Sequence, residues 1–526
     1  MRTDGSAVAI ESGTVLGHAV AAGDVRAFLG IPFAAPPVGP LRWRAPMPAA
    51  EWTQPLVADR TGPMPMQRLS AGDSIFGANG ALSEDCLQLN VWTPARATTA
   101  PLPVMVWVHG GGHMSGSGTL PQYSGAGLAR KGAVVVTLNY RVASLGFLAH
   151  PEISAESGSG TSGNFGLLDI IAALEWVQRN IANFGGAPDQ VTLFGQSAGA
   201  SLVLCLMTSP RTKGLFHRAI VQSPGPLKGP DGRMTRLAAA EQRGLAFAEE
   251  LGCKSLAELR NMPADALVAA PGFMPIADGI VIPDDVHAVF ARGGAHPLPL
   301  LGGWNRDEGT AYLQPDHKDE FVAALKRKFG ELADALLALY PIGSDADVAR
   351  AAAMIMRDEV FAWSAESSLR GHAAGGSKAF LYEFEHCPPF PARTAMREHV
   401  RGAGAPGMRQ GRLKSDREFG AYHGAEIVYA LDNFDAVPSP WRDVDRRLAE
   451  TMSDCWLAFD RTGDPNHGGL PAWPAYDRNR RLAMHFGERI EAGPISNRAG
   501  VEFFDALYRS NDKSSEQKDP TKRAVA

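Results

Sequence analysis

The stretch 191–201 constrains the fold of this chain more than any other part of the sequence. It reads Val-Thr-Leu-Phe-Gly-Gln-Ser-Ala-Gly-Ala-Ser, so a short apolar run ends in Gly-x-Ser-x-Gly and a helical pattern of small residues follows. Strand, sharp turn and helix in this order are the context of a nucleophile elbow. Such a turn strains the serine backbone and tolerates only very small residues two positions away, where Gly195 and Gly199 stand. The pattern predicts that Ser197 projects its hydroxyl above a sheet, at the positive end of a helix.

The composition narrows the possible partners of the chain. Of its 526 residues, 45% are hydrophobic and 20% charged, which is typical of a globular protein with a substantial core. The formal net charge is -5, so we expect neither nucleic acid nor a polybasic membrane contact. The longest apolar runs, 104–108 and 133–138, are strand-sized and too short to span a bilayer. A small-molecule partner is therefore expected.

The cysteines and the N-terminus bear on the compartment. Five widely scattered cysteines form no disulfide framework and have no metal-ligand spacing, so we predict no metal and no cofactor. The first residues, Met-Arg-Thr-Asp-Gly-Ser, lack the apolar region of a signal peptide. We expect a cytoplasmic protein, or a secreted or periplasmic one if a signal peptide has been removed.

Strand-like and helical patterns alternate along the first half of the chain. Strands are predicted over 104–108, 134–138, 191–194 and 217–222, and helices over 166–184 and 198–208. This alternation predicts an α/β fold with a large, mostly parallel central sheet and helices on both faces. After about residue 225 the pattern becomes helix-rich, with short strands at 298–301 and 378–384 and a late amphipathic helix at 443–460.

These patterns indicate a single domain over residues 1–510. Helical and loop insertions at about 225–295 and 315–420 are expected to shape the pocket. Within the second insertion, residues 393–417 form a Gly- and Arg-rich loop without periodicity. The polar segment 511–526 is predicted to be a disordered tail.

A serine on an elbow needs an oxyanion hole, a base and an acid, in the order Ser, acid, His. His109-Gly110-Gly111-Gly112 follows a buried strand and has the glycines that let backbone N–H groups approach a ligand. Gly111 and Gly112, together with Ala198, are the predicted donors. Asp307 and Glu308 both follow a strand-like segment, and either could be the acid. The base is one of seven later histidines, of which His423 stands just before an apolar run: His317, His372, His386, His399, His423, His467 and His485.

The chain resembles the type-B carboxylesterase family, which includes the cholinesterases and bacterial para-nitrobenzyl-type esterases. The resemblance extends from about residue 8 to residue 507. The stretches that carry it, in the family's order and spacing, are 28–37, 41–43, 84–87, 109–112, 139–141, 163–167, 195–199, 214–219, 305–309 and 423–426.

The resemblance implies an α/β-hydrolase fold and an esterase with the triad Ser197, Glu308 and His423. It chooses Glu308 over Asp307, and it implies an oxyanion hole of Gly111, Gly112 and Ala198. It also implies two structural ion pairs, Arg42–Glu84 and Arg141–Asp169.

Departures from the family pattern are informative. Gln196 stands where the family often has glutamate, so a negative charge beside the nucleophile is absent. His113 follows the glycines, where an aromatic or small apolar residue is usual. We interpret His113, Gln196 and Trp304 as pocket residues. Cys86 is expected to be a free thiol, because the cysteine that pairs with it in eukaryotic members is missing upstream.

We therefore predict a serine hydrolase of carboxylic esters that works through an acyl-enzyme, as a monomer or homodimer. One alternative is a carbamate or amide hydrolase with the same triad, because bond preference depends on pocket shape. A remote alternative is a non-catalytic, cholinesterase-like interaction protein. The basic stretch 393–417 precedes His423, which suggests a polar or anionic ester as substrate.

Overall fold

The fold is built on one large mixed sheet. The computed structural model describes residues 7–69, 80–96, 99–228, 233–270, 272–312, 315–389 and 419–516, the last seven of these by backbone alone. Eleven strands of this part of the chain form the sheet in the order β16-β15-β14-β13-β12-β11-β9-β10-β8-β4-β3. Their bounds are β3 His18–Val20, β4 Val25–Pro32, β8 Gln88–Pro94, β9 Leu102–Val108, β10 Val134–Leu138, β11 Gly186–Gln196, β12 Arg218–Gln222, β13 Leu300–Asn305, β14 Ala379–Phe384, β15 Leu482–Phe486 and β16 Ile490–Pro494.

The centre of the sheet is parallel and its edges are antiparallel. The strands from β10 to β15 pair in parallel, whereas β8, β4 and β3 at one edge and β16 at the other pair antiparallel. Two small sheets accompany it, made of β1 Ala7–Ile10, β2 Gly13–Leu16 and β5 Leu56–Val57, and of β6 Met64–Pro65 and β7 Leu82–Ser83. The carboxyl ends of the parallel strands therefore meet at one edge, where open α/β sheets bind ligands.

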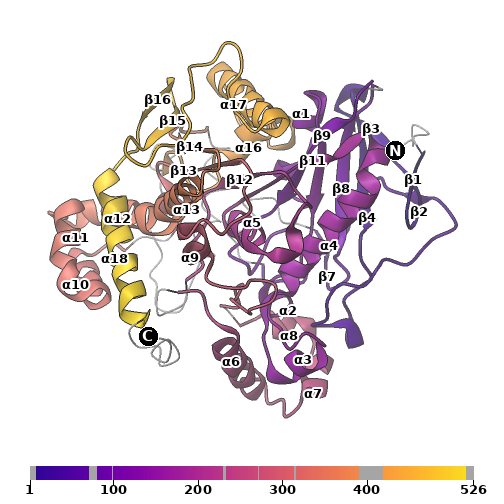
Figure 1. Ribbon diagram of the computed structural model, residues 1–526, viewed down its shortest axis with the longest axis horizontal. Helices are drawn as coiled ribbons and strands as arrows, with labels where there is room; N and C mark the ends of the chain where they lie inside the picture. The colour runs from indigo at the N-terminus through magenta and orange to yellow at the C-terminus, as the bar shows by residue number, and fades with distance from the viewer. Residues whose placement is uncertain are drawn as a thin grey trace.

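Helices cover both faces of the sheet (Figure 1). Their bounds are α1 Ala126–Arg130, α2 Ala143–Phe147, α3 Pro151–Glu156, α4 Phe165–Asn180, α5 Ala198–Thr208, α6 Leu237–Glu250, α7 Leu256–Asn261, α8 Ala264–Leu267, α9 Val286–Ala291, α10 Lys318–Phe329, α11 Ala333–Leu339, α12 Asp345–Met356, α13 Trp363–Ala374, α16 Ile427–Ala430, α17 Asp443–Thr462 and α18 Arg498–Glu516. None of the helices in the described ranges is both long and apolar enough to cross a membrane.

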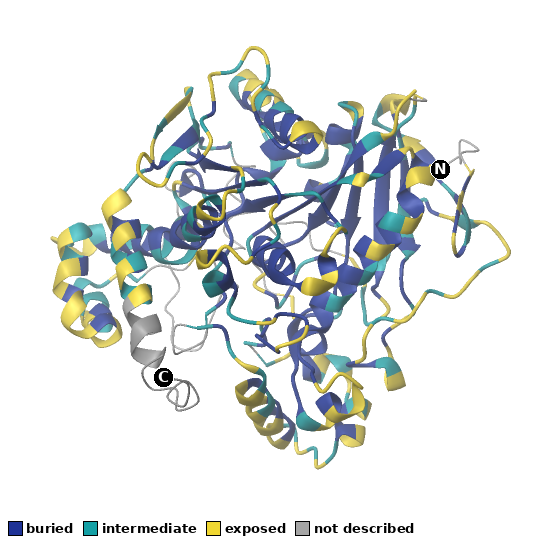
Figure 2. Cartoon of the chain, viewed as in Figure 1, coloured by how far each residue is buried: buried dark blue, intermediate teal, exposed yellow. Residues whose placement is uncertain are grey.

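Alternation along β9 shows how the sheet divides the core. Val104, Val106 and Val108 belong to the core on the α4 and α5 side, whereas Met105 and Trp107 belong to the core under α16 and α17. Successive side chains of a strand point to opposite faces, so a strand covered on both sides is apolar throughout. Figure 2 shows the result as dark strands and a dark α5 at the centre, with exposed residues on the outer helices, the loops and edge strands such as β16.

The predicted α/β architecture is confirmed, and most predicted elements form with small shifts at their ends. The helix predicted over 166–184 is α4, which continues as the 3-10 turn Ile181–Phe184 and ends at Gly185, whose φ of 85° suits glycine. The strand predicted over 191–194 is longer, because β11 begins at Gly186. Local sequence patterns alone do not locate the ends of helices and strands accurately.

The end of the chain differs from the prediction of a disordered tail over 511–526. The helix α18 continues to Glu516, six residues into that segment, while residues 517–526 lie outside the described residues. Helix propagation adds a backbone hydrogen bond for each residue once a turn is anchored, and Val501 and Phe504 anchor α18 in the core. The polar composition of the segment carried no sign of this anchoring.

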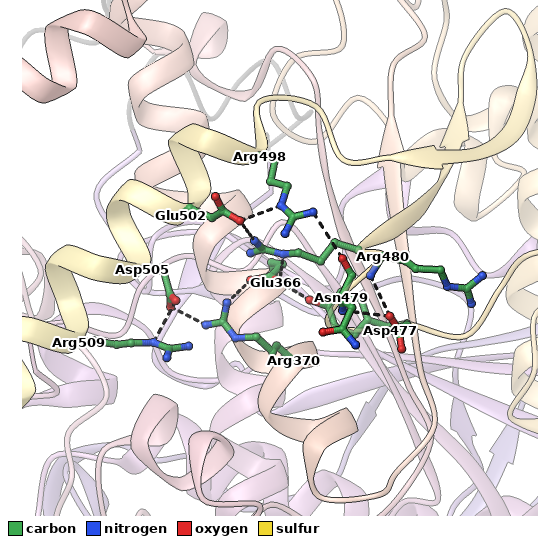
Figure 3. A network of polar contacts seen from close by, with 11 residues as sticks. Glu366, Arg370, Asp477, Asn479, Arg480, Arg498, Glu502, Asp505 and Arg509 are labelled. Carbon is green, nitrogen blue, oxygen red and sulfur yellow. Dashed lines mark hydrogen bonds and ion pairs between the residues drawn. The ribbon is translucent and has the colours of Figure 1, made fainter.

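A polar network attaches α18 to the rest of the domain (Figure 3). Its centre is Glu366 on α13, a fully buried carboxylate that accepts hydrogen bonds from Arg481 at 2.8 Å, from Arg370 at 2.9 Å and from the Tyr476 hydroxyl. The two arginines continue to α18, where Arg370 pairs with Asp505 at 2.5 Å and Arg481 with Glu502 at 2.8 Å. One buried charge thus joins α13, the 476–481 segment and the last helix.

We predict that Glu366→Ala lowers the free energy of unfolding by about 3–5 kcal/mol, because it leaves the buried Arg481 without its central partner. Urea unfolding would measure the loss. The matched control is Arg498→Ala, which removes a half-exposed partner of Glu502 and should change stability by less than about 1 kcal/mol. Equal losses in the two variants would contradict a central role for Glu366.

Candidate active site

Ser197 lies at the sharp turn between β11 and α5. Its φ of 57° and ψ of -127° are strained backbone angles for a residue other than glycine. The turn is held by the Ser197 amide, which donates to the Gln222 carbonyl on β12 at 2.8 Å. A Cβ on Gly199 would lie 2.1 Å from the Val108 carbonyl oxygen, and one on Gly195 would lie 2.7 Å from the same atom. The two glycines are therefore needed for the turn to pass over the end of β9.

The loop after β9 lies directly beside this turn. A Cβ on Gly110 would lie 3.0 Å from the Ser197 Cβ, and one on Gly111 would lie 2.1 Å from the Ser115 carbonyl oxygen. Gly111 and Gly112 have φ values of 117° and 63°, which a larger residue rarely adopts. Ala198 is the first residue of α5, so its amide is one of the N–H groups without a partner inside the helix. The three predicted oxyanion donors thus belong to two segments in contact.

His423 and Glu308 meet near the serine although 115 residues separate them. The imidazole Nδ1 and the Glu308 carboxylate are 2.5 Å apart, and Glu308 is fully buried. Glu308 begins the 3-10 turn Glu308–Ala311 directly after β13, and its second oxygen accepts from the Asn305 amide at 2.8 Å. The end of β13 thus fixes the Glu308 carboxylate, which directs one oxygen at the His423 imidazole.

The neighbouring Asp307 has a different role in the structure. Its carboxylate accepts from the backbone amide of Ala421 at 2.9 Å, and its own amide donates to the Ala421 carbonyl at 3.0 Å. Asp307 therefore holds the segment that carries His423 against the end of β13. Sequence left the two acids open, and the geometry brings only Glu308 to the imidazole.

Gln196, the residue before the serine, contacts the other side of the imidazole. Its amide nitrogen lies 3.1 Å from the His423 Nε2, and the residue is buried. The hydrogen bonds described for His423 are therefore to Glu308 on one ring nitrogen and to Gln196 on the other.

A second buried carboxylate lies behind the pair. Glu426 accepts from Asn305 at 2.5 Å and from Gln222 at 3.1 Å. Burial, and then the nearby charge of Glu308, raise the pKa of Glu426 from 4.5 to about 7. Asn305 thus bonds both carboxylates. Sequence reasoning assigned no role to Asn305 or Glu426, although both stand in stretches that resemble the family.

Aromatic rings cover the imidazole. The Phe361 and His423 ring centroids are 4.5 Å apart, and Tyr312 lies 5.7 Å from the same ring. Phe361 belongs to a π-helical stretch, Arg357–Ala362, between α12 and α13. Such stretches often occur at functional sites. No sequence signal marked Phe361, because nothing in its local pattern distinguishes a π-helical turn from an α-helical one.

The three predicted pocket residues, His113, Gln196 and Trp304, are all buried but have different neighbours. His113 is buried at φ 64°, beside Phe147, and burial lowers the pKa of His113 to about 3, so this imidazole stays neutral. Trp304 is fully buried on β13. Gln196 alone among the three touches His423 in the contacts described. The Arg-rich stretch 393–417 and His399 lie outside the described residues.

The two expected ion pairs both form. Arg42 donates to Glu84 at 2.7 and 2.5 Å, and Arg141 donates to the fully buried Asp169 at 2.8 and 2.7 Å. Cys86 is buried and forms no disulfide, as predicted, and none of the five cysteines, all of which lie in the described ranges, is part of a disulfide.

Other candidate bases and ligands lie elsewhere in the structure. His372 bonds the Leu298 carbonyl, and His386 pairs with Asp445 at 2.6 Å. Within the described ranges one group has three close donor atoms of metal-ligand type, Glu383, Glu385 and His485. Its imidazole already bonds Glu385 at 2.9 Å, and the group includes no predicted site residue.

Ser197 lies at a strained turn between a parallel strand and a buried helix. A glycine loop and a carboxylate–imidazole pair lie beside it. This arrangement is that of a serine hydrolase with the α/β-hydrolase fold. Residues 4–503 match the carboxylesterase family, and the chain belongs to that family. It is accordingly a carboxylic ester hydrolase.

Several curated relatives match most of the chain. Fumonisin B1 esterase from Sphingopyxis macrogoltabida is 39% identical over 494 residues, covering 90% of this chain and 85% of the relative. Phenmedipham hydrolase from Pseudarthrobacter oxydans is 33% identical, covering 88% and 91%. Para-nitrobenzyl esterase from Bacillus subtilis is 33% identical, covering 89% and 92%.

Solved structures show the same fold. A PNB esterase structure superimposes with a TM-score of 0.76 at 30% identity, covering 95% of this chain and 99% of that chain. A thermophilic PNB esterase superimposes with a TM-score of 0.79 at 30% identity and the same coverage.

The raised pKa of Glu426 predicts how stability depends on pH. In the unfolded chain this carboxyl loses its proton near pH 4.5, but in the folded protein near pH 7. The folded state binds more protons between these values, so its stability should fall as pH rises from about 4.5 to 7. The contribution is on the order of 3 kcal/mol.

Glu426→Gln should remove this contribution while keeping an oxygen for Asn305. Urea unfolding of both proteins from pH 4.5 to 8 measures it, and the decline should be shallower in the variant. Buried Asp460, whose pKa burial also raises to about 7, contributes in both proteins and serves as the internal reference. Parallel pH curves would contradict this account.

Proposed function

We propose that this esterase works through Ser197, His423 and Glu308. The observation that carries the proposal is the 2.5 Å contact between Glu308 and the His423 Nδ1, beside a serine on a strained turn. An ionised Glu308 only accepts hydrogen bonds, so it keeps the Nδ1 proton in place and leaves Nε2 as the basic nitrogen. His423 takes the Ser197 proton as the hydroxyl attacks the ester carbonyl, and Glu308 stabilises the imidazolium that forms.

The oxyanion of the tetrahedral intermediate is proposed to bind to the amides of Gly111, Gly112 and Ala198. The positive end of α5 adds to this stabilisation. His423 then returns its proton to the leaving alcohol, and the acyl group stays on Ser197. Water, activated by the same imidazole, hydrolyses the acyl-enzyme.

The triad acid can be tested directly. Glu308→Gln should lower kcat by about three to four orders of magnitude, because the base loses its orienting carboxylate. Asp307→Asn should cost far less, because the amide oxygen can still accept from Ala421. Steady-state kinetics on a nitrophenyl ester measure both, with Ser197→Ala as the inactive reference. A larger loss in Asp307→Asn would overturn the assignment.

The substrate class is proposed from the relatives and from the basic stretch 393–417. One relative is named for hydrolysis of phenmedipham and another for fumonisin B1, so both compounds belong in the test beside simple esters. Bond preference depends on pocket shape, and carbamates and amides remain the alternative to esters. The basic charge of residues 393–417 supports a polar or anionic ester.

A panel of nitrophenyl esters, carbamates and dicarboxylate monoesters is expected to rank esters first by kcat/KM. An anionic monoester should exceed its neutral analogue at low salt, and its advantage should fade as ionic strength rises. Arg412→Ala and Arg417→Ala should reduce that advantage. Identical salt responses for charged and neutral esters would leave the basic stretch without a role in substrate binding.

The remaining proposals concern the whole molecule. A reducing, cytoplasmic compartment is supported by the five cysteines, none of which forms a disulfide in the described ranges. We further propose a single catalytic domain in which the insertions at about 225–295 and 315–420 shape the pocket, in a monomer or homodimer.

A further inference from the structure

The contact between Gln196 and His423 involves Nε2, the nitrogen that takes the Ser197 proton in the proposed mechanism. A neutral imidazole carries one proton, and the carboxylate of Glu308 at 2.5 Å holds that proton on Nδ1. Nε2 then has only a lone pair and must accept a hydrogen bond. The Gln196 side chain, 3.1 Å away, therefore donates through its amide nitrogen. The positions of the nitrogen and oxygen in the Gln196 side-chain amide are assigned from these hydrogen bonds, because the two atoms have nearly the same shape.

The other end of the amide is also constrained. The Gln196 Oε1 would lie 3.0 Å from a Cβ on Gly110, so the side chain lies between the glycine loop and the imidazole. Gln196 is buried, and its backbone is paired with Gln222 at the end of β11. The side chain is thus held at the base from a rigid strand end, next to the nucleophile.

We propose that Gln196 is a positioning residue that binds the basic nitrogen of His423 in the resting enzyme and yields it to Ser197 when substrate binds. This inference rests on the proposed triad. The lone pair that must accept the serine proton is occupied by an amide N–H until the imidazole turns toward the hydroxyl. An N–H donor stabilises the neutral, active form of the base, whereas a carboxylate at the same place would stabilise its protonated, inactive form.

The groups around the imidazole allow the influence of residue 196 on the protonation of His423 to be measured. Among the described residues, the titratable groups that the structure places near it are Glu308, Glu426 and Tyr312, and the Phe361 ring packs against it. Because Gln196 is neutral, a substitution to glutamate adds one charge next to Nε2 with almost no change in shape.

The test is the pH dependence of kcat/KM for a neutral nitrophenyl ester. Gln196→Glu should move the midpoint of the acid limb to higher pH by about one unit or more, as expected for an opposite charge within about 6 Å of a cation. Gln196→Met, which removes the donor and keeps the length, should move it in the same direction by a smaller amount. A residue that only fills space would lower activity at every pH and leave the midpoint unchanged.

Two controls separate the possible failures. Gln178→Glu adds the same charge on α4, where Gln178 bonds Pro188 at the opposite end of β11, and should leave the midpoint unchanged. His423→Ala tests the proposed function itself. If His423→Ala is inactive and Gln196→Glu keeps the wild-type midpoint, the role of Gln196 is refuted. If His423→Ala keeps its activity, the proposed triad is refuted instead.

Discussion

The site depends on backbone segments that approach more closely than any side chain allows. At Ser197 the chain turns from β11 into α5, and Gly195 and Gly199 pass over the Val108 carbonyl with no room for a Cβ. The strain of the serine backbone, of order 1–3 kcal/mol, persists because the buried strand and the buried helix fix the turn from both sides. The glycine loop after β9 then lies against the same serine. The proposed role of Ser197 as the nucleophile depends on this close approach.

Other elements place the proposed base, His423, and the proposed acid, Glu308. Glu308 lies three residues after the end of β13, and its side chain accepts from the backbone amide of Asn305, the last residue of that strand. His423 comes from a segment 115 residues later. Asp307 attaches this segment to the end of β13, because its backbone amide donates to the Ala421 carbonyl and its carboxylate accepts from the Ala421 amide. Asp307 therefore holds the segment that carries His423, and the adjacent Glu308 contacts the imidazole.

Buried charges connect the C-terminal elements of the chain to the elements around the site. Glu366 connects α13 with the last helix through two arginines, and α13 continues from the π-helical stretch that places Phe361 on His423. An isolated carboxylate at either Glu366 or Glu426 would be costly, and each is bonded by several donors instead. The described donors to Glu426, Asn305 and Gln222, are both neutral, and burial together with the nearby Glu308 raises the pKa of Glu426.

The sequence by itself determined the elbow, the glycine loop and a large, mostly parallel sheet. These features are local: a strained turn needs glycine at fixed positions, and strands buried on both faces are apolar throughout. It also pointed to His423 and Glu308, but only through resemblance, since composition left seven histidines and two acids open.

Tertiary structure alone decided which groups meet. The contact of Gln196 with the basic nitrogen, the sharing of Asn305 by two carboxylates and the cover of Phe361 all join segments that are distant in the chain. The helical course of residues 511–516 likewise depends on where α18 packs. Such contacts are set by the packing of whole elements, and no local pattern records them.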